Sequence, residues 1–558
     1  MMLVVSVHAW ASALAANQPM SREHVEAVNR TRRIIFHHDA GANTHFPLQN
    51  VGPERIHDVV QLLVSPLDAP GNQIDSVWYD WCEGNHAVWR SEILPPLAWG
   101  AYPGWWEAGH DIVDLVLNAA RQRGREVFFT YRINGGDHDF GLRIPPIKLE
   151  HPEWTHDAYA GLGYDKKHIF WNFAFKEVRD YKLAVLRELA ENYDFDGISV
   201  DWCSGAVCFP PGEQWLHRNQ LTDFMRRVRR MMLDVEKQRG RPLLLAVRVP
   251  ENIMGCQFDG IDIRAWIREQ LVDIIVLGIR SSEVDFNAFR SLAMGTGIKL
   301  YPSFDYVHTS DSYDYTPIEY SRGIYANWWQ QGADGGYMFN NYHLEPSLAA
   351  KLDASRSKQG WEMECQRFRE IGDPQTLAFL DKVFFVQRRG YMDGIIVPKP
   401  EDWWTPRHKY TGTNMFEALP AAIPDDPRVD RLLTLRVGDD VNAARDRIEK
   451  LTLRLALLDP EAEQLPAADR YVGVAGARRH NPPPSLYMAR GIEQVIEVRV
   501  NNVLLERGHV VEGWLLFPVK PEQLALGDNL IGVRMTERRP DSAAPISIEK
   551  LELRVDYR

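Results

Sequence analysis

Carboxylic side chains stand where several short apolar runs of the chain end. Asp201 follows GISV, Glu251 follows VRVP, and Asp305 closes IKLYPSFD. Cleavage of a glycosidic bond needs two such groups, because one protonates the leaving oxygen while the other attacks the anomeric carbon or activates water. We therefore predict that two carboxyl groups at such positions act together in a reaction of this kind.

A second group of residues ends or follows the same kind of run and suits the binding of a sugar. Aromatic rings offer flat surfaces for stacking, while carboxylate, amide and imidazole groups can bond to hydroxyls. The predicted substrate-binding residues are His37, His38, Asp39, Asp80, Trp81, Tyr131, Arg132, Trp202, Arg248 and Asn340. The two arginines could orient a carboxylate or hold an anionic sugar, or they could brace loops. The histidines lack the His-x-His spacing of metal-dependent barrel hydrolases, so we predict neither a metal nor a cofactor.

The elements that must position these residues alternate between strands and helices from residue 32 to 345. Eight β-branched or aromatic runs occur, at 33–39, 75–81, 126–134, 197–202, 243–250, 272–278, 298–305 and 335–341. Between them lie amphipathic helical patterns such as 110–124, 176–193 and 221–240. This alternation predicts βαβ units and an α/β fold, a (β/α)8 TIM barrel, whose active site lies at the carboxyl ends of the strands.

The pattern changes after the barrel. Residues 346–424 form a mixed connector with a Pro/Trp-rich stretch, PKPEDWWTP. From 425 to 558 the apolar residues recur with period two, in runs at 448–457, 491–506, 513–520, 529–538 and 546–558. Such runs need a second sheet to cover one face, so we predict a C-terminal antiparallel β-sandwich that packs on the barrel and could also bind sugar.

The segment DFDGISVDW (194–202) resembles the strand-four signature of (β/α)8 glycoside hydrolases, particularly the α-amylase-like and α-glucosidase-like groups. The resemblance implies that Asp201, the final Asp of D-G-x-x-x-D, is the nucleophile. It also implies that the acid is a Glu just past strand five, which is Glu251, while other glycosidase clans place a carboxylate at the position of Asp305. Ser199 departs from the arginine of the α-amylase pattern, and Ser199 with Cys203 departs from the chitinase pattern. The whole chain more loosely resembles bacterial glycosyl-hydrolase-like proteins with a barrel and a β-sandwich.

Composition narrows the choice of partners and location. The 558 residues carry a net charge of −12, which argues against nucleic acid as a partner. No stretch is long and apolar enough for a membrane span. Residues 1–31 form an N-terminal segment that begins MMLVVSVHAWASALAA, apolar like a signal peptide but without a leading Lys or Arg, and it favours a secreted or periplasmic location over a cytoplasmic one. The five cysteines show no zinc spacing, and the oligomeric state stays open.

The sequence is consistent with three functions. The first is a glycoside hydrolase that cleaves an oligo- or polysaccharide by a two-carboxylate mechanism. The second is a carbohydrate-binding barrel without catalysis, which differs from the first in lacking a second carboxylate near Asp201. The third is a metal-dependent hydrolase built on His37 and His38.

Overall fold

A computed structural model gives the structure of the chain. It describes residues 20–45, 48–81, 85–134, 144–157, 169–203, 207–278, 281–306, 316–341, 343–354, 358–388, 417–459, 491–537 and 545–558. The leader-like start of the chain and the stretch PKPEDWWTP lie outside these residues. Among the described residues, no helix has both the length and the apolar character needed to cross a membrane.

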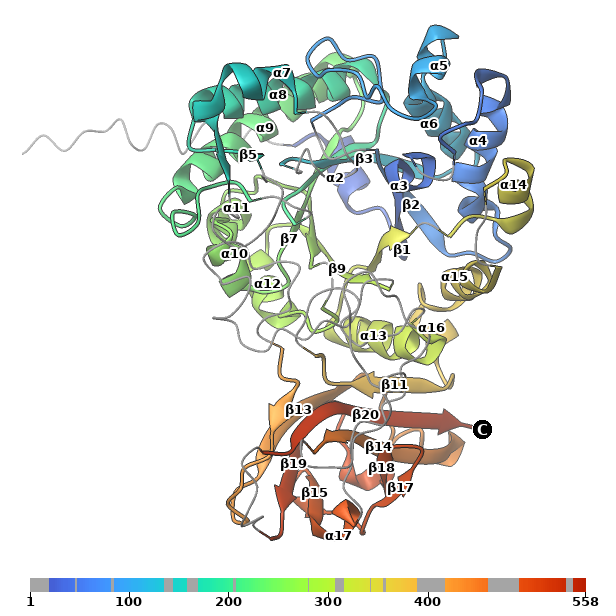
Figure 1. Cartoon of the computed structure of the whole chain (residues 1–558), viewed down its shortest axis with the longest axis vertical. Helices are drawn as coiled ribbons and strands as arrows, with labels where there is room; N and C mark the ends of the chain where they lie inside the picture. Colours follow the sequence, from blue (N-terminus) through green and yellow to red (C-terminus); the bar gives the residue numbers. More distant parts are fainter. Residues whose placement is uncertain are drawn as a thin grey trace, which may run out of the picture.

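Eight parallel strands close into a barrel, as the eight apolar runs predict (Figure 1). The strands are β1 (Ile34–Asp39), β2 (Ile74–Asp80), β3 (Glu126–Arg132), β6 (Gly197–Asp201), β7 (Leu244–Val249), β8 (Ile274–Leu277), β9 (Lys299–Asp305) and β10 (Gly336–Asn341). Each strand pairs with the next of this series, and β10 closes the ring on β1. The sequence did not indicate a small antiparallel pair, β4 (Thr155–Asp157) with β5 (Ile169–Trp171), which follows β3.

Helices surround the barrel. They are α3 (Ala40–His45), α4 (Ile56–Val64), α5 (Tyr102–Glu107), α6 (Ile112–Gln122), α7 (Pro146–Glu150), α8 (Lys176–Asn192), α9 (Arg218–Arg239), α10 (Ile253–Phe258), α11 (Ile263–Arg268), α12 (Phe286–Ala293), α13 (Ile318–Gln331), α14 (Pro346–Lys351), α15 (Lys358–Glu370) and α16 (Pro374–Leu377). The three predicted helices are confirmed as α6, α8 and α9. Local signals set their ends: the Asp111 carboxylate caps the start of α6, and Gly240, with φ 67°, ends α9.

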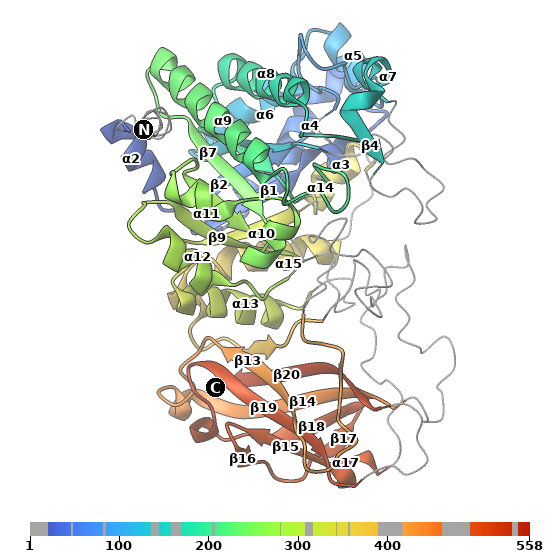
Figure 2. The same ribbon diagram turned by 90° about the vertical axis from the view of Figure 1, so that its left-hand side faces the viewer.

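The barrel interior is packed with side chains rather than open. Trp78 stacks on Phe128 with ring centroids 4.5 Å apart, and Leu244, Ile274 and Tyr301 belong to the same buried cluster. A helix ahead of the barrel, α2 (Arg22–Val28), contributes Val28 to this cluster and lies at the amino-terminal end of the strands (Figure 2). The opposite end, where the strands terminate, is therefore the one that can hold a site.

Two ion-pair groups stabilise the amino-terminal end of the barrel. Arg32 grips both carboxylate oxygens of Glu126 at 2.7 Å and donates to three backbone carbonyls. Arg229 grips both oxygens of Asp273, which also accept from His24 and from a backbone N–H of β7. The other nitrogen of His24 lies 2.7 Å from Glu236. We refer to these residues as the basal network.

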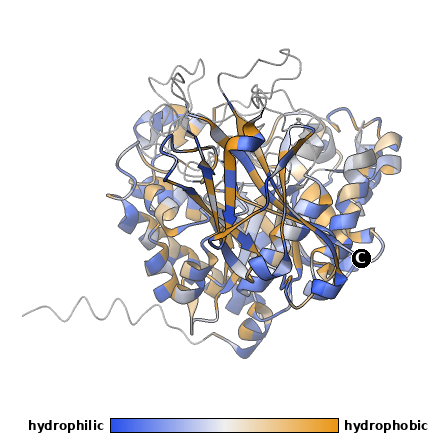
Figure 3. Ribbon diagram, turned by 90° about the horizontal axis from the view of Figure 1, so that it is seen from below, coloured by the Kyte–Doolittle hydropathy of each residue, from blue (hydrophilic) through white to orange (hydrophobic). Residues whose placement is uncertain are grey.

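The C-terminal region is a sandwich of two antiparallel sheets, as the period-two runs predict. One sheet has the order β11 (Lys382–Phe385), β20 (Ser547–Tyr557), β14 (Ile448–Leu458), β18 (Trp514–Pro518) and β17 (His509–Val511), with β12 (Ala421–Ala422) beside β20. The other has the order β13 (Arg431–Val437), β19 (Gly527–Met535), β15 (Ile496–Val500) and β16 (Val503–Leu504); the short helix α17 (Ile492–Val495) precedes β15. Hydrophobic and hydrophilic residues alternate along the strands (Figure 3). Strand β11 comes from the connector, so the sheet begins earlier in the chain than residue 425.

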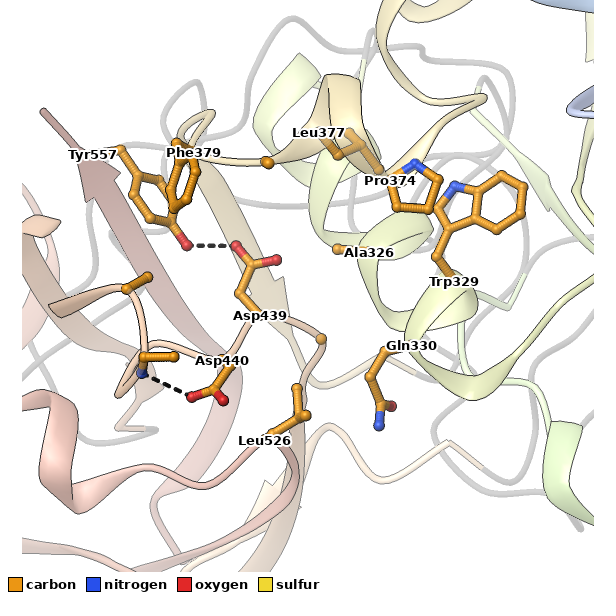
Figure 4. A pocket seen from close by; sticks show the side chains of 14 residues that line it. Ala326, Trp329, Gln330, Pro374, Leu377, Phe379, Asp439, Asp440, Leu526 and Tyr557 are labelled. Carbon is orange, nitrogen blue, oxygen red and sulfur yellow. Dashed lines mark hydrogen bonds between the residues drawn. The ribbon is translucent and has the colours of Figure 1, made fainter. Parts of the chain in front are cut away.

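The sandwich packs on the side of the barrel at α13 (Figures 1 and 2). Two glycines permit this close approach: a Cβ at Gly323 would lie 2.1 Å from the carbonyl oxygen of Val383, and one at Gly438 would lie 2.5 Å from that of Ala326. Beside this contact is a cavity of about 510 Å³ lined by Trp329, Phe379 and other residues of both units (Figure 4). Beyond the end of β8, the C-terminal unit also contacts the barrel, because Ser281 donates to Glu417 and Ser282 donates to Gln387.

Candidate active site

Side chains at the carboxyl ends of the strands alternate between the barrel interior and the surrounding helices. In β6, Ser199 and Asp201 point inward, whereas Val200 and Trp202 belong to the core between the sheet and the helices. The same alternation holds in the neighbouring strands. Among the described residues, the ionisable side chains on the inward side are those of His37, Asp39, Asp80, Arg132, Asp201, Arg248 and Asp305. All of them are buried.

Asp201 and Arg248 form the central ion pair of this group. They lie side by side because Asp201 and Arg248 are register partners of β6 and β7. Arg248 donates from Nη2 to Oδ2 at 2.5 Å and from Nε to Oδ1 at 3.1 Å, and the N–H of Cys203 donates to Oδ1 at 2.8 Å. Burial alone would raise the pKa of Asp201, but the charge and hydrogen bonds of Arg248 outweigh it and hold the pKa well below its usual value. Asp201 is therefore an anion at any physiological pH.

Arg132, at the end of the adjacent strand β3, links two further carboxylates. Its Nη2 donates to Asp39 at 3.0 Å, and its Nε is paired with Asp80. The guanidinium also contributes to the low pKa of Asp201. Four neighbouring strands, β1, β2, β3 and β6, thus present anionic or cationic groups to one space.

His37 completes the polar surface on the β1 side. The backbone N–H of Asn340 donates to its Nδ1 at 3.1 Å, which assigns the proton of the neutral ring to Nε2, and Nε2 lies 3.8 Å from an oxygen of Asp80. Burial, followed by the charges of Arg248 and Arg132, lowers the pKa of His37 well below its usual value. The imidazole is therefore neutral and can donate a hydrogen bond.

Glu251 and Asp305, the two candidates for the second carboxylate, are both buried. Glu251 follows β7 and packs against Gly278 after β8, where a Cβ would lie 3.0 Å from the Cβ of Glu251. Asp305 is the last residue of β9 and is paired in register with Phe339 of β10. Around the ring, β7 is the neighbour of β6, whereas β9 is separated from β6 by β7 and β8.

Four of the predicted substrate-binding residues face the helices. His38 lies against Phe36 and Tyr79, and Trp81 is buried near the same Tyr79. The Tyr131 hydroxyl accepts from Lys182 of α8, and Trp202 packs among Phe173, Phe224 and Trp266. These positions place His38, Trp81, Tyr131 and Trp202 outside the group of inward-facing charges.

One inward-facing aromatic residue was missed by the sequence reading. The Phe339 ring lies 3.6 Å from the guanidinium carbon of Arg248 and 4.7 Å from the imidazole of His37. It thereby supports the two groups that surround Asp201. Alternation along β10 was the available signal, because residues two apart in a strand share a face.

The solved structures that resemble this chain include glycoside hydrolases. No family model matches the sequence, and neither does any curated protein. The α-L-fucosidase isoenzyme 2 from Paenibacillus thiaminolyticus is similar over 63% of this chain and 51% of its own length, at 13% identity and a TM-score of 0.38. The glycoside hydrolase domain of PgaB (BpsB) from Bordetella bronchiseptica is similar over 60% of this chain and 98% of its own length, at 11% identity and a TM-score of 0.38. An α-amylase from Lactobacillus plantarum is similar over 65% of this chain and 84% of its own length, at 12% identity and a TM-score of 0.35. The chain spans about half the length of the fucosidase. The barrel assignment rests on the closed eight-stranded sheet itself.

Proposed function

We propose that the protein is a glycoside hydrolase that cleaves an oligo- or polysaccharide with two carboxyl groups. The observation that carries the proposal is Asp201, a carboxylate at the end of β6 that Arg248 keeps ionised among inward-facing polar groups. An ionised carboxylate in this place suits attack on an anomeric carbon or electrostatic stabilisation of the cationic transition state, but not donation of a proton.

The proton donor in this proposal is Glu251. It follows β7, the strand next to β6, and this adjacency supports a position for its carboxyl group beside Asp201. Asp305 at the end of β9 is the alternative donor. Whichever residue serves, the leaving alkoxide takes its proton, and water supplies the hydroxyl that ends on the anomeric carbon.

The remaining inward-facing groups bind the sugar. Asp39 and Asp80, fixed by Arg132, can accept hydrogen bonds from hydroxyls, and the Nε2–H of His37 can donate one. Because Arg132 and Arg248 already hold carboxylates of the protein, we propose a neutral rather than an acidic sugar at this point of the site.

Asp201→Asn, compared with Asp196→Asn, tests the proposal. Both residues belong to the D-G-x-x-x-D segment, but Asp196 lies at the opposite end of β6, where its carboxylate accepts from the N–H of Val127. Release of reducing sugar from a panel of neutral polysaccharides and aryl glycosides is measured. We expect turnover in the wild type and in Asp196→Asn, and its loss in a folded Asp201→Asn protein. Normal turnover in Asp201→Asn would contradict the proposal.

A carbohydrate-binding barrel without catalysis is the second candidate. The bidentate grip of Arg248 favours it, because both oxygens of Asp201 already have donors. Under this function the wild type binds a saccharide of the panel in calorimetry, releases no reducing sugar, and keeps its affinity in Glu251→Gln.

A further inference from the structure

An acidic side chain on α15 is buried without a hydrogen-bond partner. In the described part of the chain, neither carboxyl oxygen of Glu364 has such a partner, and the side chain is 1% exposed. The nearest cationic atom is Nη1 of Arg367, at 3.8 Å. Since an unsatisfied buried carboxyl group is costly, its presence calls for a physical account.

Arg367, one turn further along α15, holds the chain that follows β9. Its Nε donates to the hydroxyl of Ser321 at 3.0 Å, and its Nη2 donates to the carbonyl of Thr316. The guanidinium carbon lies 4.6 Å from the centre of the Tyr306 ring. Arg367 therefore contacts residues on both sides of the connection between β9 and α13, and none of these contacts uses Nη1.

The contact between Arg367 and Tyr306 lies one residue from the candidate active site. Tyr306 points outward toward α13 and α15, and its immediate neighbour Asp305 is the buried, inward-facing end of β9. A movement of the backbone at Tyr306 would therefore also move Asp305. In the part of the chain that the structure describes, Glu364 interacts electrostatically with Arg367 and Cys365 on its own helix, with Tyr306 after β9, and with Tyr325 on α13.

We propose that Glu364 and Arg367 form a positioning pair that fixes the carboxyl end of β9 while Glu364 is protonated and loosens it when Glu364 ionises. The importance of Asp305 in this proposal rests on the proposed function, whereas the loosening of residues 300–306 and 316–325 does not. Among the described residues, the cation paired with an ionised Glu364 is Arg367, and closing the 3.8 Å gap between them would draw the guanidinium away from Thr316 and the Tyr306 ring.

The proposed change falls in the neutral range. Burial, only partly offset by Arg367, raises the pKa of Glu364 from 4.5 to about 7. The unfolded chain releases this proton near pH 4.5 and the folded chain near pH 7, so the folded state loses stability as pH rises across this window. Glu364→Gln, which cannot ionise, removes that loss.

Hydrogen exchange followed by mass spectrometry, at pH 6 and pH 8, tests the proposal on the full-length protein. The wild type, Glu364→Gln and the control Glu362→Gln are compared; Glu362 is exposed on the same helix. After correction for the intrinsic pH dependence of exchange, we expect the protection of peptides covering 300–306 and 316–325 to fall about tenfold in the wild type and the control between pH 6 and pH 8. Glu364→Gln should show no such fall. Its melting temperature should exceed that of the wild type at pH 8 and equal it at pH 4.5.

Equal protection of the wild type at both pH values, or an equal fall in Glu364→Gln, would overturn the proposal. The exchange measurement does not depend on turnover. If the protein hydrolyses no sugar but shows the pH-dependent protection, the proposed function is wrong and the positioning pair stands. If it hydrolyses sugar but its protection does not depend on pH, the positioning pair is wrong and the proposed function stands.

Discussion

The two ends of the barrel each bury an aspartate gripped by an arginine, and they differ in what surrounds the pair. Arg229 holds Asp273 at the amino-terminal end as Arg248 holds Asp201 at the carboxyl end, and both aspartates have a pKa well below the usual value because their arginines outweigh the effect of burial. In the basal network, Asp273 also bonds to His24 and to a backbone N–H of β7. Around Asp201 lie further side chains that point into one space.

The comparison teaches that a buried ion pair with a lowered pKa does not by itself identify a catalytic residue. Position decides, because the loops that can enclose a substrate gather at the carboxyl ends of the strands. The part of the basal network around Asp273 joins α2, α9, β7 and the start of β8 at the amino-terminal end of the strands, away from those loops, so we expect it to contribute to stability.

The largest effect expected is on the stability contributed by the basal network. Asp273→Asn leaves Arg229 buried without its anion, and this should lower the free energy of unfolding by about 3–5 kcal/mol. Urea denaturation measures the loss. The folded fraction should keep the turnover of the wild type, and a loss of turnover as large as that of Asp201→Asn would remove the distinction between the two ends.

The basal end should add its own pH dependence of stability, in a higher range than that of Glu364. Burial alone would lower the pKa of His24, but the hydrogen bonds and charges of Asp273 and Glu236 raise it from 6.5 to about 9. The stabilisation is therefore full below pH 6.5 and is lost as pH rises through 9, which amounts to about 3 kcal/mol. Urea denaturation of the wild type and His24→Gln between pH 6 and 9.5 checks this. Parallel curves for the two proteins would contradict it.

A smaller effect, confined to turnover, is expected at the carboxyl end for Glu251→Gln. Removal of the proton donor should slow hydrolysis of substrates with poor leaving groups by about a hundredfold, while activated aryl glycosides lose far less because their departure needs little protonation. Steady-state kinetics on both substrate types provide the measurement. Equal losses would transfer the role of donor to Asp305, with Asp305→Asn as the decisive variant.

The smallest effect separates the two faces of β1. His37→Phe removes the inward-facing Nε2–H and should raise KM about tenfold, the equivalent of one hydrogen bond. The side chain of His38 faces the helices beside Phe36 and Tyr79, so His38→Phe should leave both kcat and KM unchanged. Similar kinetic changes in the two variants would show that alternation along the strand does not select the residues of the site.

The sequence predicted the barrel well because each strand is a short apolar run bounded by a helical pattern. All eight runs became barrel strands, and the five period-two runs became sandwich strands or parts of them. Strands β11, β12, β13 and β17 were missed. Three of them are two to four residues long, and such lengths carry no period; β13, with seven residues, alternates along RLLTLRV and could have been found.

The candidate site was less predictable, for a geometric reason. Consecutive residues of a strand face opposite sides, so Asp201 and Trp202, or Arg132 and Tyr131, cannot both line the barrel interior. The residues predicted from the strand ends therefore included both inward-facing and outward-facing side chains. The partnership of Asp201 with Arg248 was also beyond the sequence, because it depends on the register of β6 against β7.

Strand β20 gives the molecule a defined response to mechanical load. It runs between β11 and β14, and β11 directly continues the chain that leaves the barrel after α16. A force that pulls residue 557 along the strand away from the barrel acts on the hydrogen bonds of both neighbours in shear, so many must break together. The N–H of Tyr557, bonded to Asp381 at 2.8 Å, adds a further tie at the barrel side. The sandwich should therefore resist extension along β20 far more than peeling of its edge strand β17, which pairs with β18 alone.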